Sequence, residues 1–193
     1  MHKNGFINVG LWENDTQIGI GYEIMGDSCF YFGDFNNGKK NGIGVYKWSD
    51  NNKYEGEIKN NFFNGYGMYI YNDGRKYCGH WKENHMDGFG EMNWIEGNKY
   101  IGSYKNDKKD GFGIYYSPKD IIFVGFWKMG KQEGFGKYIN KNKIKYGVWK
   151  NGKKEKKYEN EDDFYNDLNI NNINYSIFQW NINKIKDFLE LNK

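Results

Sequence analysis

The chain has 193 residues and a formal net charge of +3, and it combines 20% aromatic residues with a hydrophobic fraction of only 38%. It contains 26 glycines, one proline and no alanine, so the composition fits neither a Leu- and Ala-rich helical bundle nor a collagen-like chain. Disorder is also disfavoured, because so many aromatic residues can bury apolar surface. The single arginine, Arg75, argues against a protein that reads nucleic-acid bases.

The beginning of the chain, residues 1–5, lacks the apolar core of a secretion signal. The most apolar stretch, residues 121–127, is far too short to span a bilayer. Two cysteines cannot form a disulfide framework, which favours a reducing compartment. We therefore expect a soluble cytoplasmic protein.

Glycines recur at a fixed spacing along most of the chain. Segments of the form x-Gly-x-aromatic align with steps of 23, 23, 23, 23, 23 and 22 residues at Gly10, Gly33, Gly56, Gly79, Gly102, Gly125 and Gly147. Nine residues after each of the first six comes a Gly-x-Gly. Such a period is the signature of a repeat architecture. All glycines lie at or before Gly152, so we expect a repeat region over 1–152 and a separate segment over 153–193.

Each unit reads as two strands. The first strand carries aromatic-x-Gly-x-aromatic, as in Tyr77 to Trp81, and a spacing of two places both rings and the glycine on one face. Three residues later stand Asp, Asn or Gly, which tolerate a positive φ and so predict a turn: Asp15, Gly38, Asn61, Asn84, Asp107, Gly130 and Gly152. The Gly-x-Gly opens the return strand. Bare glycines would let rings of neighbouring strands lie flat over the backbone, so most rings are expected to be core.

The repeated pattern Tyr-x-Gly-x-Trp-x-x-Gly-x-x-x-Gly-x-Gly resembles the MORN repeat (membrane occupation and recognition nexus). Residues 31–44 and 123–136 fit it closely, and the resemblance covers 6–152 as about six full repeats plus a capping half-repeat. It implies an all-β fold, an elongated single-layer antiparallel meander of hairpins, without an attached catalytic domain. It also implies a grooved aromatic face that binds partners, for which the candidate residues are Phe35, Tyr54, Trp81, Tyr104, Trp127 and Trp149.

The segment after Gly152 switches to helical patterns. Residues 153–157 are expected to be a charged linker, and Asn160 is a candidate N-cap for a short helix through about Leu168. Further on, an apolar stripe at helical spacing predicts an amphipathic helix with the contact residues Phe178, Ile182, Ile185 and Leu189. We expect this C-terminal helix to dock on the aromatic face. The alternative is that its stripe contacts a partner or a second copy.

Lysines follow the turn position of several repeats. Those expected to line one long edge of the sheet are Lys39, Lys40, Lys108, Lys109, Lys131, Lys153 and Lys154. Such an edge would attract anionic lipid headgroups at about 1 kcal/mol per charge near the surface. The simpler interpretation is that charged turns keep an exposed sheet soluble.

No catalytic constellation emerges, so we expect a protein that is not an enzyme and needs no cofactor. Cys78, His80 and His85 are weak candidates for a metal site because they lie close together in sequence, yet a fourth ligand is missing. The favoured hypothesis is a non-catalytic scaffold that binds a helix or extended segment of a cytoskeletal (ciliary or cortical) or membrane-associated protein. The alternatives are peripheral binding to anionic phospholipid and a regulatory subunit of an enzyme supplied in trans. No nucleic-acid partner is expected, and the sequence leaves monomer and homodimer open.

Overall fold

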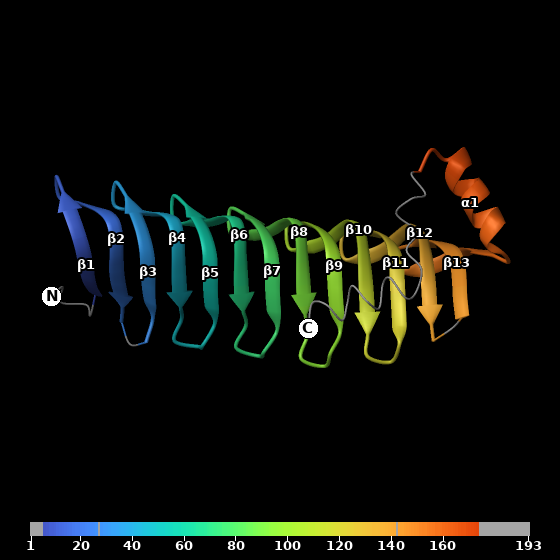
Figure 1. Ribbon diagram of the computed structural model, residues 1–193, viewed down its shortest axis with the longest axis horizontal. Coiled ribbons are helices and arrows are strands. Elements are labelled where there is room, and N and C mark those ends of the chain that lie inside the picture. Colours follow the sequence, from blue (N-terminus) through green and yellow to red (C-terminus); the bar gives the residue numbers. More distant parts are fainter. Residues whose placement is uncertain (1–5, 27, 142, 174–193) are drawn as a thin grey trace. The chain divides into compact units, whose positions relative to one another are not determined.

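The computed structural model describes residues 6–26, 28–141 and 143–173. Its fold is an open antiparallel meander of fourteen strands in chain order, followed by one short helix, which confirms the predicted all-β class (Figure 1). The chain divides into two compact units between Asp107 and Lys108, and each is described by itself.

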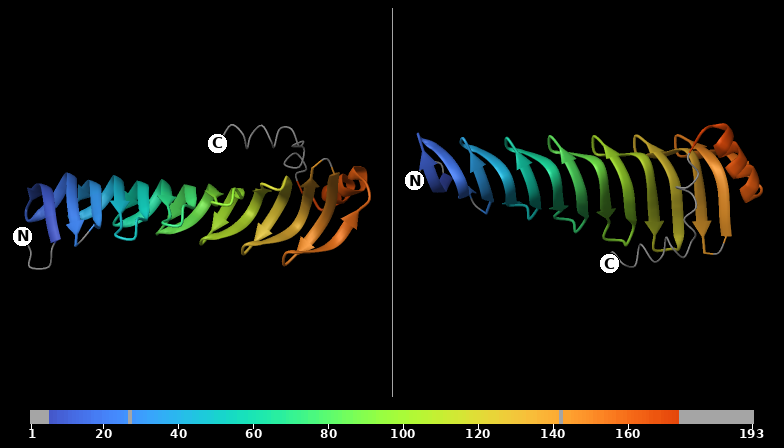
Figure 2. Two further views of the ribbon diagram at one scale, coloured as in Figure 1. Left: turned by 90° about the horizontal axis from the view of Figure 1, so that it is seen from below. Right: turned by 45° about the horizontal axis from the view of Figure 1, so that its top comes forward.

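Unit 1 consists of nine strands in one layer, with no second sheet against them (Figures 1 and 2). They are β1 Phe6–Glu13, β2 Thr16–Met25, β3 Phe30–Asn36, β4 Lys39–Lys47, β5 Lys53–Lys59, β6 Phe62–Ile70, β7 Lys76–Lys82, β8 His85–Asn93 and β9 Lys99–Lys105. Unit 2 contains β10 Lys108–Ser117, β11 Ile121–Lys128, β12 Lys131–Asn140, β13 Lys143–Lys150, β14 Lys153–Tyr158 and helix α1 Glu161–Ile170.

The predicted turns are confirmed. Between β5 and β6, Asn60 and Asn61 have φ of 50° and 71°, the left-handed pair that a two-residue hairpin turn requires. The same two-residue turn occurs at the other predicted positions, each with positive φ at its second residue. Asn, Asp and Gly stand there because they adopt this conformation at the least steric cost.

Turn residues also bond to the preceding hairpin, which the sequence did not reveal. The backbone N–H of Asn84 donates to the carbonyl of Phe63 at 3.1 Å, and its side-chain Oδ1 accepts from the Phe63 N–H at 2.7 Å. Asn61 makes the same pair of bonds to Lys40, and Asp107 makes them to Met86. Each such turn therefore extends the ladder between consecutive hairpins by one residue pair.

A row of glycines runs through the middle of each unit, with every glycine opposite another on the neighbouring strand. In unit 1 the row is Gly10, Gly21, Gly33, Gly44, Gly56, Gly67, Gly79, Gly90 and Gly102. In unit 2 it is Gly113, Gly125, Gly136 and Gly147. The rings of Tyr31, Tyr54, Tyr77 and Phe123 occupy the space that Cβ atoms would fill, so the predicted role of the glycines is confirmed.

The side of the sheet that carries these rings is called here the aromatic face. Tyr77 lies over the glycine row and donates its hydroxyl to the carbonyl of His80 at 3.0 Å, three residues further on. Tyr31, Tyr54 and Tyr100 repeat this bond at 2.9, 2.8 and 3.1 Å. The tyrosine and the glycine two residues later thus form one unit, because only a bare Cα lets the ring cross the strand.

The prediction for residues 153–157 is wrong. They form most of β14 instead of a linker, pairing with β13 from Lys150↔Lys153 to Tyr146↔Tyr158. Pairing satisfies the backbone groups of β13, and the lysines of β14 suit the outermost strand of a sheet because charge discourages further pairing. The sheet therefore continues past the predicted boundary near residue 153.

The short helix predicted after Asn160 is confirmed as α1. Asn160 is its N-cap and accepts from the Asp163 N–H at 2.9 Å, and three acidic residues in the first turn complement the helix dipole. The helix predicted around Phe178, Ile182, Ile185 and Leu189 lies outside the described residues.

Candidate functional site

The six rings predicted to line a partner-binding surface all lie on the aromatic face and are all less than one-tenth exposed. In unit 1, Trp81 contacts the rings of Tyr54 and Tyr77 edge-on at centroid distances of 5.7 and 5.1 Å. Its indole N–H donates to the carbonyl of Gly67 at 3.1 Å. These rings form the core of a single-layer sheet, so they cannot offer a partner much surface.

Half-buried rings lie above this core in unit 1. Phe63 stacks on Tyr54 at 3.7 Å, and Trp48 stacks on Tyr46 at 5.2 Å and lies 5.6 Å from Tyr69. They shield the tyrosines that cross the glycine row. On the aromatic face the accessible side chains are therefore these outer rings.

The opposite face of unit 2 carries helix α1 (Figure 2). Phe164 and Leu168, one turn apart on the helix, are fully buried. The Phe164 ring contacts Tyr146 on β13 at 5.0 Å, Tyr158 on β14 at 5.4 Å and Phe135 on β12 at 5.9 Å. Phe135 is the middle residue of a Gly-x-Gly, so this repeat position here serves as a seat for a helix.

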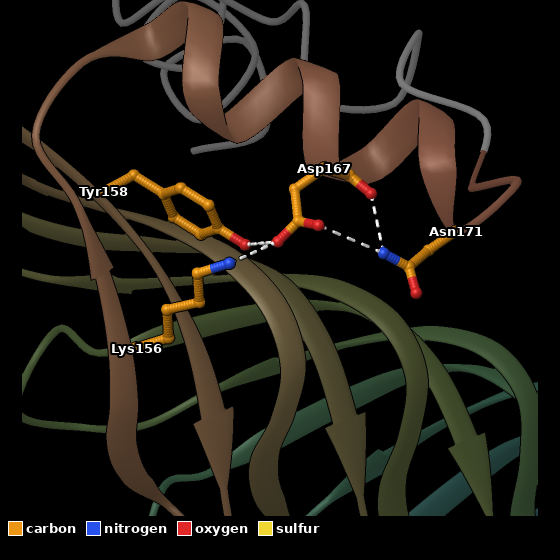
Figure 3. Close-up of polar contacts among 4 residues, drawn as sticks. All are labelled: Lys156, Tyr158, Asp167 and Asn171. Carbon is orange, nitrogen blue, oxygen red and sulfur yellow. Dashed lines mark hydrogen bonds and ion pairs between the residues drawn. The ribbon is translucent and has the colours of Figure 1, made fainter.

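Charges of opposite sign join α1 to the sheet. Asp167 accepts from Lys156 Nζ at 2.6 Å and from the Tyr158 hydroxyl, and Asn171 Nδ2 donates to the Asp167 carbonyl at 2.7 Å (Figure 3). These bonds, first of all the one from Lys156, lower the pKa of Asp167. Lys137, whose side chain is almost completely buried, lies 3.9 Å from Glu161. An acidic helix thus covers a part of the sheet that presents lysines.

In unit 1 the same repeat position is exposed. The middle residues of its four Gly-x-Gly segments are Ile20, Ile43, Tyr66 and Phe89, with 64%, 62%, 52% and 58% of their surface accessible. We call these four residues the apolar ladder. Sequence reasoning missed them because it followed the glycines and the flanking rings. The available signal was an apolar residue at every Gly-x-Gly centre, which alternation places on the other face.

Two carboxylates lie in the same row of the sheet as the apolar ladder. Asp34 is the register partner of Ile20, and Glu57 is the register partner of Ile43. Asp34 Oδ2 accepts from the Ile43 N–H at 2.8 Å, and Glu57 Oε1 accepts from the Tyr66 N–H at 2.7 Å. Neither carboxylate takes part in an ion pair within the described part of the chain.

The lysines predicted to form one edge are divided between two environments. Lys40 and Lys109 lie on the aromatic face, Lys40 within 5.3 Å of the Tyr31 ring centre and Lys109 within 4.7 Å of that of Trp127. Burial lowers the pKa of Lys109 to about 8. The other five, Lys39, Lys108, Lys131, Lys153 and Lys154, are exposed. A lipid-binding edge would therefore rest on these five.

The three weak metal candidates have other contacts. Cys78 Sγ lies 3.1 Å from the Tyr66 hydroxyl, the His80 ring contacts the Tyr66 ring edge-on, and His85 Nδ1 lies 2.5 Å from Asp107 Oδ2. Over the described ranges, no three His, Cys, Asp or Glu side chains are grouped so that they could hold a metal ion. Nor does any helix in those ranges have the length and apolarity to cross a membrane.

The glycine row, the tyrosines that cross it and the two-residue turns define a β-hairpin repeat protein. The family model of the MORN repeat matches residues 31–53, 54–74, 77–99, 100–120 and 123–143, more than half of the chain, and the chain therefore belongs to the MORN-repeat family. The matches start with β3, and the hairpins β1–β2 and β13–β14 lie outside them. No other domain is detected, and the search of curated proteins gives no match.

Proposed function

We propose that the protein is a non-catalytic scaffold that binds a helix or extended segment of a protein partner on the apolar ladder of unit 1. One observation carries the proposal. The centre of the Gly-x-Gly is more than half exposed in four repeats of unit 1, whereas in unit 2 Phe135 at this position contacts Phe164 of a docked helix. Exposed apolar rows of this kind commonly mark interaction sites.

This proposal moves the partner from the aromatic face, where the six predicted rings are buried, to the opposite face. The family resemblance favours a cytoskeletal or membrane-associated protein as the partner. Direct binding of anionic phospholipid through the exposed lysines is the alternative. A regulatory role toward an enzyme supplied in trans would use the same ladder with a catalytic partner.

A phage-displayed library of 16-residue peptides, panned on the full chain, tests the proposal. The double variant Ile43→Ser/Tyr66→Ser should lose the enriched peptides, because both side chains are exposed and their loss leaves the core intact. The control Met129→Ser removes an equally exposed apolar side chain in a turn of unit 2 and should keep them. Equal enrichment by the parent and the ladder variant would refute the proposal. Binding to vesicles with 30% phosphatidylserine without peptide enrichment would favour the lipid alternative.

A further inference from the structure

We infer that the occupant of the apolar ladder is a basic amphipathic helix. This inference rests on the proposed function and specifies the chemistry of the partner. It follows from three features: the way α1 is held in unit 2, the two fixed carboxylates beside the ladder, and the spacing of the hairpins.

Helix α1 shows how this sheet holds a helix. It inserts an aromatic and an aliphatic side chain one turn apart, Phe164 and Leu168, and both become fully buried. Its acidic residues face basic ones, with Lys156 Nζ 2.6 Å from Asp167 and Lys137 Nζ 3.9 Å from Glu161. Docking therefore combines apolar anchors with opposite charge, the arrangement that also selects partners at protein interfaces.

The ladder of unit 1 presents the reverse charge. Asp34 and Glu57 stand beside Ile20 and Ile43, and each is held in place by a backbone N–H that occupies one of its two oxygens. The other oxygen of each carboxylate remains available to a cation. A lysine or arginine that reaches such a prepositioned acceptor forms a charge-assisted hydrogen bond.

Neighbouring lysines of the same face do not neutralise this row. Lys99 pairs with Glu91 at 3.2 Å, and Lys53 pairs with Glu55. Lys47 lies on the same strand as Ile43, four residues further along, or about 13 Å at the usual rise of a strand. The carboxylates of the ladder row are thus the charges nearest to the exposed apolar side chains, and a second acidic helix such as α1 would be repelled.

Hairpin spacing sets the pattern expected in the partner. Equivalent residues of successive hairpins are two strands apart, which is about 9.6 Å at the usual strand separation. A helix that runs across the strands rises 1.5 Å per residue, so it would need an apolar anchor about every six or seven residues. Contact with all four ladder positions spans about 29 Å and needs a helix of roughly 20 residues.

Fluorescence anisotropy with two synthetic 20-residue peptides tests the inference on the full chain. Both carry leucines at one helical face, and the remaining positions are mostly lysine in one peptide and glutamate in the other. The lysine peptide should bind at least about tenfold more tightly at 0.1 M salt, and the difference should shrink at 1 M salt because ions screen the attraction. Equal affinity of the two peptides would overturn the inference.

Two variants separate the charge from the apolar contact. Asp34→Asn/Glu57→Gln keeps an acceptor for each backbone N–H but removes both charges, and it should weaken the lysine peptide about tenfold. The control Asp73→Asn/Glu96→Gln makes the same change of net charge in exposed loops of unit 1 and should have little effect. An equal loss in the control would reduce the effect to net charge and overturn the inference.

The variant Ile43→Ser/Tyr66→Ser distinguishes failure of the inference from failure of the proposed function. If it abolishes binding of both peptides while the charge variant changes nothing, the ladder binds partners without selecting basic ones, and only the inference fails. If it changes the affinity of neither peptide, the proposed function fails as well. Tighter binding of a peptide of residues 174–193 than of the lysine peptide would overturn the inference in favour of the chain's own C-terminal segment.

Discussion

Removing the same atom from two tyrosines of unit 1 should change stability in opposite directions. Tyr77 and Tyr104 both lie on the aromatic face, and their rings contact each other edge-on at 5.3 Å. Tyr77 is completely buried, and its hydroxyl donates to His80. Tyr104 is 5% exposed, and its hydroxyl has no hydrogen-bond partner. Tyr77→Phe therefore removes a made bond, and Tyr104→Phe removes a buried unpaired group.

The repeat explains why Tyr104 is unpaired. Trp81, one repeat earlier, donates its indole N–H to the carbonyl of the residue fourteen positions before it. Tyr104 holds the same repeat position with a phenol, which makes no such bond. Leaving a buried polar group unpaired costs about 1–3 kcal/mol, whereas a made hydrogen bond contributes about 0.5–1.5 kcal/mol.

We therefore expect Tyr104→Phe to stabilise the protein by about 1–2 kcal/mol and Tyr77→Phe to destabilise it by about 1 kcal/mol. Urea unfolding followed by tryptophan fluorescence, with equal m-values for all variants, measures both differences. Tyr104→Trp is a third test, since an indole should regain the bond that Trp81 makes. If both Phe variants shift the midpoint in the same direction, the hydrogen-bond argument is wrong.

Three further predictions concern other parts of the structure. Gly90→Ala should destabilise by about 1–3 kcal/mol, because its Cβ would lie 2.6 Å from Tyr77 Cζ, and the cost should disappear in a Tyr77→Ala background; an unchanged cost in that background would contradict the ring-over-glycine account. Asn84→Gly keeps the left-handed turn but removes the acceptor for Phe63 N–H, so it should cost about 1 kcal/mol in urea unfolding, and a neutral result would show that the side-chain bond contributes nothing. Asp167→Asn should speed hydrogen exchange in α1 a few-fold at pH 7, since exposed ion pairs contribute about 0.2–1 kcal/mol. Because the pKa of Asp167 is lowered, its contribution is present above the ordinary Asp pKa and lost as pH falls through the lowered value, so the parent and variant should converge in acid; a difference that persists there would exclude the carboxylate as the cause.

Much of this fold could be predicted from spacing alone. A period of 23 residues fixed the hairpins, and the Asp, Asn and Gly positions fixed the turns, because few residues adopt positive φ at low cost. The tyrosine two residues before a glycine predicted a ring over bare backbone, as Tyr77 shows. Asn160 and the acidic residues after it located α1, because helix capping is a local interaction.

Tertiary structure decided which surfaces remain accessible. In sequence, Trp81 and Phe89 are both aromatic residues of the repeat, but one is buried beside its neighbours' rings and the other is exposed on the opposite face. The sequence also indicated a linker at 153–157, since a run of lysines carries no alternation, and only pairing with β13 makes it a strand. Likewise, α1 covers Phe135 because lysines of distant strands meet its carboxylates. Exposure and charge pairing depend on residues far apart in the chain, so local spacing cannot determine them.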